Sequence, residues 1–330
     1  MKLRIIHAPS EIAGQMGMLC DGLRTAGAHA VGYNWFQSYL RYRSPAVMQT
    51  DAYELALSLD TFIRIGDLFH FHNGNSFLTD NADIPFIHAA GKKMIMHHWG
   101  SDVRTSWRTK KLNRYGLPPG YMSDKDIHER LVRLSRHIQH AVVQDAELYP
   151  HVKDYYRHVH IVPVACEVRR FRPVYPVLGS RPLRIVHAPT RPAFKGSRYV
   201  EAAITSLKRQ YPIDYISVQK KSHQEALRIY ASADVIIDQL LCGSYGVLTV
   251  EAMAMGKPVI AYIREDVRRS QPAELPIIQA DPQSIHAVLR GILQQPDRLQ
   301  VIGRASRVYV ERRHDTRVII PQLQAIYNQI

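Results

Sequence analysis

One stretch, residues 234–262, constrains the fold of this chain more than any other. It begins with three apolar residues (235–237) between two aspartates, which predicts a short buried strand. A loop with two glycines (243–246) follows, and then a run rich in alanine and methionine favours a helix over 247–255. A second apolar strand over 259–262 completes the pattern. The order strand, glycine loop, helix, strand predicts a βαβ unit whose helix N-terminus suits a phosphate.

One acid, Glu251, lies about one turn into this otherwise apolar helix. It falls near the carboxyl ends of the predicted strands, where open α/β sheets bind their ligands. A carboxylate at that position can accept hydrogen bonds from the hydroxyl groups of a ribose. The same pattern also fits a purely structural βαβ unit with a solvated Glu251, so the pattern alone leaves both interpretations open.

The segment from Glu251 to Ala261 reads Glu-Ala-Met-Ala-Met-Gly-Lys-Pro-Val-Ile-Ala. It resembles the nucleotide-sugar signature of GT-B glycosyltransferases, in particular retaining glycosyltransferase family 4, the group 1 glycosyltransferases. That signature has two glutamates eight positions apart, and Glu251 corresponds to the second. Gly243 stands at the position of the first. The glutamate that contacts the donor sugar in the family is therefore absent from this chain.

A short repeat indicates two similarly built domains. Residues 4–9 read Arg-Ile-Ile-His-Ala-Pro, and residues 184–189 read Arg-Ile-Val-His-Ala-Pro. Two half-chains that begin with the same strand and loop suggest two Rossmann-like domains. Between them, residues 160–173 resemble the segment at which the family's chain crosses between domains, and a proline-rich linker over 173–182 follows.

The resemblance implies an α/β GT-B fold, with two Rossmann-like parallel-sheet domains facing across a cleft and a C-terminal helix that returns to the N-terminal domain. We expect an acceptor-side domain over 1–172, joined by the helix at about 316–330. A nucleotide-sugar-binding domain is expected over 173–315.

The donor site is predicted from a second motif. Arg191 and Lys195 flank a helix entry, where the cations and the helix dipole together attract an anion. The segment resembles the family's Gly-Arg-x-x-x-x-Lys-Gly element, whose Arg and Lys hold the donor diphosphate, but its Arg–Lys spacing is one residue shorter. Lys195 therefore carries over better than Arg191. The resemblance implies catalytic roles for Lys195, Arg191, Glu251 and His98, and a donor-binding set that adds Gly14, Thr190, His223, Asp238, Gln239, Gly243, Ser244, Tyr245, Gly246 and Val247.

Polar residues also follow two predicted strands of the first domain. Residues 67–72 resemble the family's Asp-x-x-His-x-His strand, and a strand from Lys93 ends at two adjacent histidines. In the family, a histidine at this strand end commonly contacts the donor sugar. Adjacent residues of a strand face opposite ways, so only one of the two can do so. Asp102 either belongs to this site or caps the following turn. The acceptor-side residues expected are Gly17, His72, His97 and Asp102.

Composition limits the remaining classes. The chain has 330 residues, no signal-peptide pattern and no apolar run long enough to cross a bilayer, so we expect a cytoplasmic protein. Its three cysteines are scattered singly, which fits a reducing compartment. The 17 histidines show no HExxH spacing and no acidic cluster, so we expect no metal and no cofactor beyond the donor itself.

The net charge of +14 indicates anionic substrates or an anionic membrane surface, because no nucleic-acid-binding motif is present. Residues 103–137 carry nine Lys and Arg against three acids. This segment predicts an amphipathic helix whose basic face either is simply solvated or docks peripherally on the inner face of a membrane.

We therefore expect a metal-independent, hexosyltransferase-type glycosyltransferase. It would move a sugar from a UDP- or GDP-linked donor to a saccharide or lipid-linked acceptor, with retention, in cell-surface polysaccharide or glycoconjugate synthesis. The alternatives are a catalytically silent sugar-nucleotide-binding protein and a sugar-nucleotide epimerase of the same fold.

Overall fold

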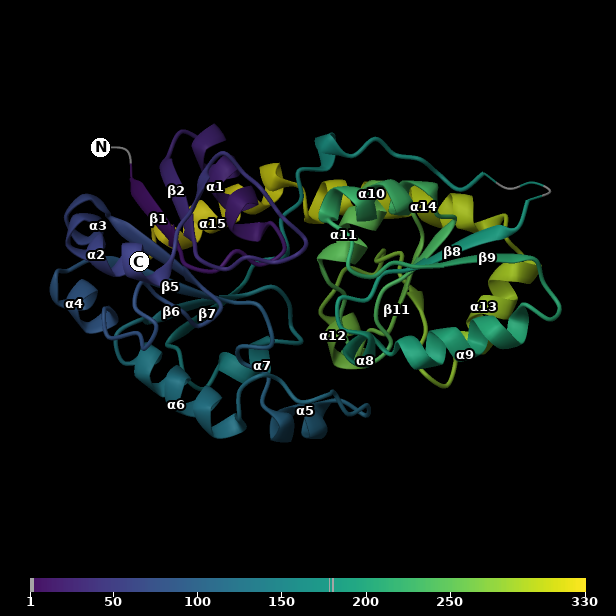
Figure 1. The fold of residues 1–330 in the computed structure, drawn as a ribbon, viewed down its shortest axis with the longest axis horizontal. Helices are drawn as coiled ribbons and strands as arrows, with labels where there is room; N and C mark the ends of the chain where they lie inside the picture. The colour runs from purple at the N-terminus through teal and green to yellow at the C-terminus, as the bar shows by residue number, and fades with distance from the viewer. Residues whose placement is uncertain (1–2, 178, 180) are drawn as a thin grey trace. The chain divides into compact units, whose positions relative to one another are not determined.

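The computed structural model describes residues 3–177, 179 and 181–330 (Figure 1). The chain forms two compact units. Unit 1 comprises residues 1–109, 119–165 and 316–330, and unit 2 comprises residues 110–118 and 166–315. The division after residue 165 lies seven residues before the predicted one, and the excursion over 110–118 was not predicted. Asn113 ties this excursion to unit 2, because its Nδ2 donates to the carbonyl of Leu241 at 2.7 Å.

Unit 1 is built on a seven-stranded, all-parallel sheet with the order β3-β2-β1-β4-β5-β6-β7. The strands are β1 (Arg4–Ala8), β2 (His29–Asn34), β3 (Val47–Gln49), β4 (Leu68–His72), β5 (Lys93–His98), β6 (His140–Val143) and β7 (His158–Ile161). In the register of the central pair, His72 lies opposite His97. The predicted strand ends at 72 and at 97–98 are therefore neighbours at the carboxyl edge of this sheet.

Helices follow the strands of unit 1 in the alternation that parallel sheets require. They are α1 (Gln15–Thr25), α2 (Ala52–Leu57), α3 (Leu59–Ile65), α4 (Ile84–Ala89), α5 (Ser106–Leu112), α6 (Asp124–Ser135), α7 (Tyr149–Val152) and, from the end of the chain, α15 (Thr316–Tyr327). The predicted amphipathic helix is α6, which buries Ile127, Leu131 and Leu134. The last residues of α5 already belong to unit 2.

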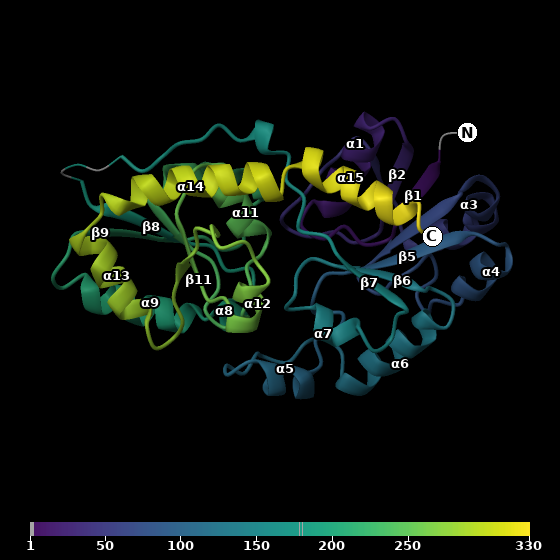
Figure 2. The ribbon, with the colours of Figure 1, turned by 180° about the vertical axis from the view of Figure 1, so that it is seen from behind.

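The central strands β1, β4, β5 and β6 are buried on both faces, whereas the edge strands β3 and β7 are partly exposed. Successive side chains alternate, so Ile5 and Ile6 join two different core clusters. One cluster draws on α3, α4 and α6, and the other draws on α1 and α15. The C-terminal helix lies beside α1 in both views (Figure 2), and a Cβ added to Gly22 of α1 would stand 2.5 Å from Ile320 of α15. The two helices thus approach closely at a glycine.

Unit 2 has a five-stranded parallel sheet with the order β12-β11-β10-β8-β9. Its strands are β8 (Leu183–His187), β9 (Ile213–Ser217), β10 (Val235–Ile237), β11 (Val259–Ala261) and β12 (Ile278–Gln279). Its helices are η1 (Val168–Arg170), α8 (Pro192–Lys195), α9 (Ser197–Leu207), α10 (His223–Ser232), α11 (Val247–Ala254), α12 (Glu265–Arg269), α13 (Ile285–Gln294) and α14 (Arg298–Arg313). The stretch over 234–262 folds as predicted, as β10, α11 and β11.

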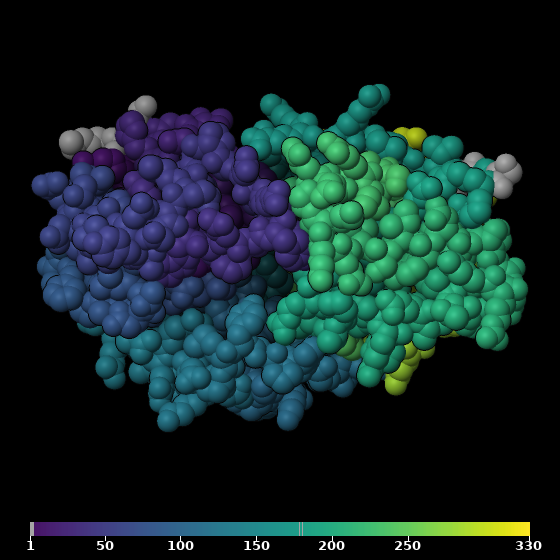
Figure 3. Space-filling view, in the orientation of Figure 1, coloured from purple at the N-terminus to yellow at the C-terminus, as the bar shows by residue number. Residues whose placement is uncertain are grey.

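Each unit has its own apolar core, and within each unit side chains cover the helices and strands (Figure 3). Two parallel-sheet α/β units and a C-terminal helix that belongs to the first of them confirm the predicted fold class. The predicted linker over 173–182 includes Leu178 and Ser180, which lie outside the described residues. Within the described part of the chain, no helix has the length and apolar character needed to cross a membrane.

Candidate functional site

The carboxyl edge of the unit 2 sheet brings together a cation and a buried carboxylate. Lys195 ends α8, and Asp238 follows β10 directly. The Nζ atom of Lys195 lies 2.5 Å from Oδ1 of Asp238 and 2.9 Å from Oε1 of Gln239. An ammonium group has three donors, so one of them makes no hydrogen bond to the described residues. Three of the predicted donor-site residues thus form one hydrogen-bonded group.

Asp238 also connects this group to the start of α11. Its second oxygen, Oδ2, accepts the hydroxyl of Thr249 at 2.7 Å and the backbone N–H of Gly246 at 3.2 Å. Burial alone would raise the pKa of Asp238, but the charge of Lys195 and these hydrogen bonds outweigh it and hold the pKa below its ordinary value. The side chain is therefore an ionised internal counterion, because Lys195, Thr249 and Gly246 occupy both of its oxygens.

Gly243, at the position of the missing glutamate, has a backbone that favours glycine. Its φ angle is 89°, and an added Cβ would stand 3.1 Å from the Cβ of Arg264. Residues with side chains rarely adopt this φ region. A glutamate could therefore not simply be restored here without strain, and Gly243 contributes backbone atoms only.

The ribose-binding residue predicted from the sequence, Glu251, is paired with His223. Glu251 lies in α11, and His223 is the first residue of α10, which begins with a capping box between Ser222 and Glu225. The Nε2 atom of His223 lies 2.7 Å from Oε1 of Glu251. Oε2 of Glu251 makes no hydrogen bond within the described residues. Two predicted donor residues from separate helices are therefore in contact, with one carboxylate oxygen left to accept.

The other predicted donor-binding residues have varied surroundings. Arg191 caps the start of α8, with its guanidinium 5.5 Å from the centre of the Phe194 ring. Tyr245 is buried and lies 3.1 Å from Nε2 of His314 through its hydroxyl. Thr190 is exposed, Ser244 is buried, Val247 is the first residue of α11, and Gly14 belongs to unit 1.

The two adjacent histidines of β5 have different surroundings. His98 is fully buried, with Nδ1 at 2.6 Å from Oδ2 of Asp102 and Nε2 at 2.9 Å from the hydroxyl of Tyr156. Asp102 also accepts the backbone N–H groups of Trp99 and Gly100, so it caps the turn and orients His98. Burial opposes ionisation of Asp102, yet His98 and Arg130 lower its pKa to about 2. Both ring nitrogens of His98, predicted as catalytic, are thus engaged by the protein.

His97 points to the other face of the sheet and joins three further buried histidines. Nδ1 of His97 lies 3.2 Å from Nε2 of His70, and Nδ1 of His70 lies 2.6 Å from the hydroxyl of Tyr327. Nε2 of His97 is buried and has no hydrogen-bond partner among the described residues. His97, rather than His98, is therefore the strand-end histidine with a ring nitrogen left for a ligand.

The same cluster contains the metal-like grouping of the described residues. His7, His70 and His72 offer ring nitrogens within 4.8 Å of one another, and all three side chains are buried. Burial lowers the pKa of His7 to about 3 and that of the other two well below the ordinary value, so all three are neutral at pH 7. Neutral imidazoles can bind Zn²⁺, but these nitrogens already hydrogen-bond to other side chains.

Sequence reasoning missed Glu11, which occupies the N-terminus of α1. Its two carboxylate oxygens accept the backbone N–H groups of Met16 at 3.0 Å and Gly17 at 2.8 Å. Burial raises the pKa of Glu11 to about 7 against these hydrogen bonds. Gly17 lies so close to Ser44 that an added Cβ would stand 2.6 Å from the Cβ of Ser44. No spacing in the sequence marks this contact, since an isolated glutamate in a loop is common.

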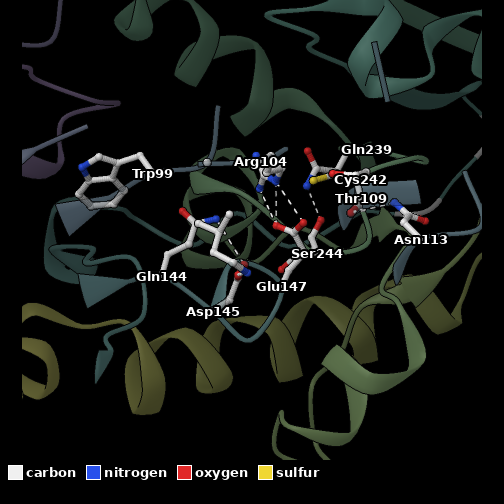
Figure 4. A network of polar contacts seen from close by, with 12 residues as sticks. Trp99, Arg104, Thr109, Asn113, Gln144, Asp145, Glu147, Gln239, Cys242 and Ser244 are labelled. Carbon is white, nitrogen blue, oxygen red and sulfur yellow. Dashed lines mark hydrogen bonds and ion pairs between the residues drawn. The ribbon is translucent and has the colours of Figure 1, made fainter. Parts of the chain in front are cut away.

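The basic segment over 103–137 is partly neutralised by the protein itself. Arg104 makes a bidentate ion pair with the buried Glu147, with its closest contact at 2.6 Å (Figure 4). Arg108 pairs with Asp154 at 2.9 Å, and Arg130 donates to the carbonyl of Asp102 at 2.8 Å. Part of the positive charge that was predicted to face either solvent or a membrane therefore serves internal contacts.

Comparison with solved structures shows which known proteins share this architecture. No family model and no curated protein matches the sequence. Among solved structures, HepE from Anabaena in complex with UDP-glucose matches with a TM-score of 0.68 at 11% identity over 100% of both chains. Sucrose-phosphate synthase from Thermosynechococcus elongatus matches with a TM-score of 0.62 at 14% identity, over 99% of this chain and 98% of that one. Trehalose-6-phosphate synthase, from a study of glycosyl transfer with retention, matches with a TM-score of 0.68 at 8% identity over 99% of both chains.

The chain has the GT-B fold. These structures match over almost their whole length, so the resemblance covers both units and is not confined to one Rossmann-like domain. At these identities the match concerns the fold. In this GT-B chain, the contacts described above show which residues interact, because a shared fold does not specify them.

Proposed function

We propose that this protein is a nucleotide-sugar-dependent glycosyltransferase whose donor site lies at the carboxyl edge of the unit 2 sheet. The observation that carries the proposal is the joint placement of Lys195, Asp238 and the start of α11, together with the Glu251–His223 pair. Solved structures of the same fold contain UDP or UDP-glucose, which supports a nucleotide sugar as the ligand.

In the proposed reaction, Lys195 holds the donor diphosphate. Its unused N–H donor and its positive charge stabilise the negative charge that develops as the anomeric C–O bond breaks. Asp238 keeps the ammonium group in place, and Arg191 adds a second cation at the entry of α8. Glu251 accepts the ribose hydroxyls through Oε2 while His223 orients the carboxylate.

The acceptor hydroxyl then attacks the anomeric carbon from the face that the diphosphate leaves, which gives retention. Its proton passes to the departing diphosphate oxygen, so the atoms balance without a protein base and without a metal. We propose a saccharide or a lipid-linked saccharide as the acceptor. For a lipid-linked acceptor, the exposed Trp107 and the cations Lys110 and Lys111 on α5 support a peripheral membrane contact.

Ligand binding is the first test. Unfolding temperatures are measured with UDP, GDP, ADP and their sugars for the wild type, Lys195→Ala and Glu251→Ala. A nucleotide at 100 times its Kd should stabilise the wild type by about 2.7 kcal/mol, and both variants should lose most of this effect. Asp266→Ala changes an exposed side chain and serves as a control, which should keep the stabilisation by nucleotide. If no nucleotide changes the wild-type unfolding temperature, the proposed donor site is wrong.

One observation favours the second candidate, a catalytically silent sugar-nucleotide-binding protein. Gly243 replaces the sugar-contacting glutamate of the resembling family, and its φ of 89° is unfavourable for any residue with a side chain. Turnover separates the two. A transferase releases nucleoside diphosphate faster when an acceptor saccharide is added, whereas a silent protein binds the donor and leaves it intact. Chromatography of the recovered donor sugar reveals an epimerase in the same experiment.

A further inference from the structure

Four buried histidines of unit 1 form a hydrogen-bonded chain whose direction is set at one end by Trp99. The indole Nε1–H can only donate, and it lies 3.2 Å from Nδ1 of His72. Nδ1 of His72 is therefore an acceptor. A neutral imidazole carries one proton, so that of His72 is on Nε2.

The next two links follow from this assignment. The Nε2–H of His72 donates to Nδ1 of His7 at 3.0 Å, so His7 also carries its proton on Nε2. That atom lies 3.5 Å from the hydroxyl oxygen of Tyr327, the longest link of the chain. The hydroxyl accepts this weak bond and keeps its own proton for Nδ1 of His70, at 2.6 Å.

The chain ends at His97. With Nδ1 occupied as an acceptor, His70 carries its proton on Nε2 and donates to Nδ1 of His97 at 3.2 Å. His97 must then carry its own proton on Nε2, the buried atom without a partner among the described residues. In the alternative arrangement, Nδ1–H of His70 would donate to the hydroxyl of Tyr327. The hydroxyl proton would then point at the Nε2–H of His7, which disfavours this arrangement.

We propose that Tyr327 of the C-terminal helix is a positioning residue, which acts through His70 to hold His97 as the Nε2–H tautomer. His97 then presents a fixed donor to a hydroxyl or ether oxygen of the saccharide. The saccharide as ligand rests on the proposed function, whereas the tautomer does not. The indole of Trp99 does not release its proton, so the chain orients a donor and does not conduct protons.

The surroundings favour a neutral ligand oxygen. Burial lowers the pKa of His97 well below its ordinary value, so the ring is an uncharged donor at pH 7. His98 and His7 act in the same direction, and the nearby carboxylate of Asp102 would repel an anionic ligand group. Trp99 stacks on the His97 ring with 3.9 Å between the ring centres, which fixes the ring plane.

The test is the tautomeric state of each histidine in protein labelled with ¹⁵N-histidine, from long-range ¹H–¹⁵N correlation spectra at pH 7. Single His→Gln variants assign the signals. We expect His7, His70, His72 and His97 all to be neutral Nε2–H tautomers. A wild-type His97 protonated on Nδ1 overturns the proposal.

Tyr327→Phe supplies the decisive comparison, because it removes the hydroxyl and keeps the packed ring. His70 and His97 should become mixtures of both tautomers, while His72 and His7 stay anchored by Trp99. Tyr156→Phe, which removes the buried hydroxyl bonded to His98, is the matched control and should leave all four unchanged. Unchanged tautomers in Tyr327→Phe contradict the proposal. If that variant does not fold, Trp99→Phe replaces it, and there His72 and His7 should lose their fixed state.

Two further readouts separate the possible failures. If the purified protein contains stoichiometric zinc and its histidine spectrum changes on chelation, the four histidines are metal ligands. The proposed hydrogen-bond assignment is then wrong. With an active transferase, Tyr327→Phe should raise the KM of the saccharide about twofold with little change in kcat, because an even mixture leaves about half of the His97 rings as the Nε2–H tautomer that binds. If the tautomers match and no nucleotide binds, the proposed function fails and the tautomer assignment remains.

Discussion

Asp238 illustrates how a single buried charge organises the candidate donor site. The residue receives Lys195, Thr249 and Gly246 at one strand end, so it orders both the cation and the start of α11. A buried carboxylate is stable only with such partners. The positions of the groups expected to meet a diphosphate therefore depend on a residue that is itself enclosed.

Asp238→Asn removes the counterion and leaves Lys195 without it. Breaking a buried ion pair from one side costs about 3 to 5 kcal/mol of unfolding free energy, which chemical denaturation measures. The exposed pair of Lys125 with Glu129 on α6 is the control, and Glu129→Gln should change stability by less than about 1 kcal/mol. Equal effects of the two substitutions would show that burial of the pair is unimportant.

The same carboxylate predicts a pH dependence. Its folded pKa lies below the ordinary value of 3.8, so its stabilising contribution is present above that value and is lost as the pH falls through the folded pKa. The difference in unfolding free energy between wild type and Asp238→Asn should therefore be constant between pH 5 and 7 and shrink below about pH 4. A difference that stays constant down to pH 2 contradicts this assignment.

At the scale of elements, the N-terminus of α1 holds the carboxylate of Glu11. The pKa of this group is raised from 4.5 to about 7 by burial, so the folded state prefers the protonated form. Stability from this group is therefore full at pH 4 and falls as the pH rises from 4.5 through 7. In Glu11→Gln this loss should be absent. Unfolding temperatures of both proteins from pH 4 to 8 should diverge in favour of the variant, and parallel curves would contradict the prediction.

Helix contacts give a prediction with opposite signs at two glycines. In Gly22→Ala, on α1, the new Cβ would meet Ile320 of α15 at 2.5 Å, so overpacking should cost about 1 to 3 kcal/mol of unfolding free energy. In Gly291→Ala, within α13, the Cβ meets nothing within 4 Å, so the helix should gain about 0.5 to 1 kcal/mol. Denaturant unfolding of both variants measures the pair, and stabilisation by Gly22→Ala would mean that α15 does not pack there.

For the whole molecule, the division into units matters most at the C-terminus. Helix α15 belongs to unit 1 although it follows unit 2 in the chain, and it supplies Ile319, Leu323 and Tyr327 to a unit 1 core. A chain ending at residue 315 should therefore lose the cooperative unfolding of unit 1 and become sensitive to protease there. The nucleotide binding proposed for unit 2 should persist, which titration calorimetry can measure. Intact unit 1 in this truncated chain would contradict the role of α15.

Periodicity and turn residues in the sequence were sufficient to predict the local elements. The buried strand at 235–237, the helix that follows the glycine loop, and the repeated strand that opens each half all depend on contacts between near neighbours in the chain. The GT-B architecture was implied by the resemblance of the segment from Glu251 to Ala261 to a family signature. The structure also brings Lys195 to Asp238 and Glu251 to His223, all of them residues selected from motifs, whose roles toward a donor stay predictions.

Only the tertiary structure decided which side chains of these elements face one another. In the structure both ring nitrogens of His98 have protein partners, whereas Nε2 of His97 has none among the described residues. Strand alternation shows that the two side chains face opposite ways, but it does not show which of them has a free nitrogen. The tertiary structure also brought Tyr327 to His70 across 257 positions of sequence. Such contacts depend on how distant elements pack, and hydrophobic periodicity specifies a buried face without specifying the partner on it. The local sequence therefore determined the strands and helices, and packing determined the polar networks at their ends.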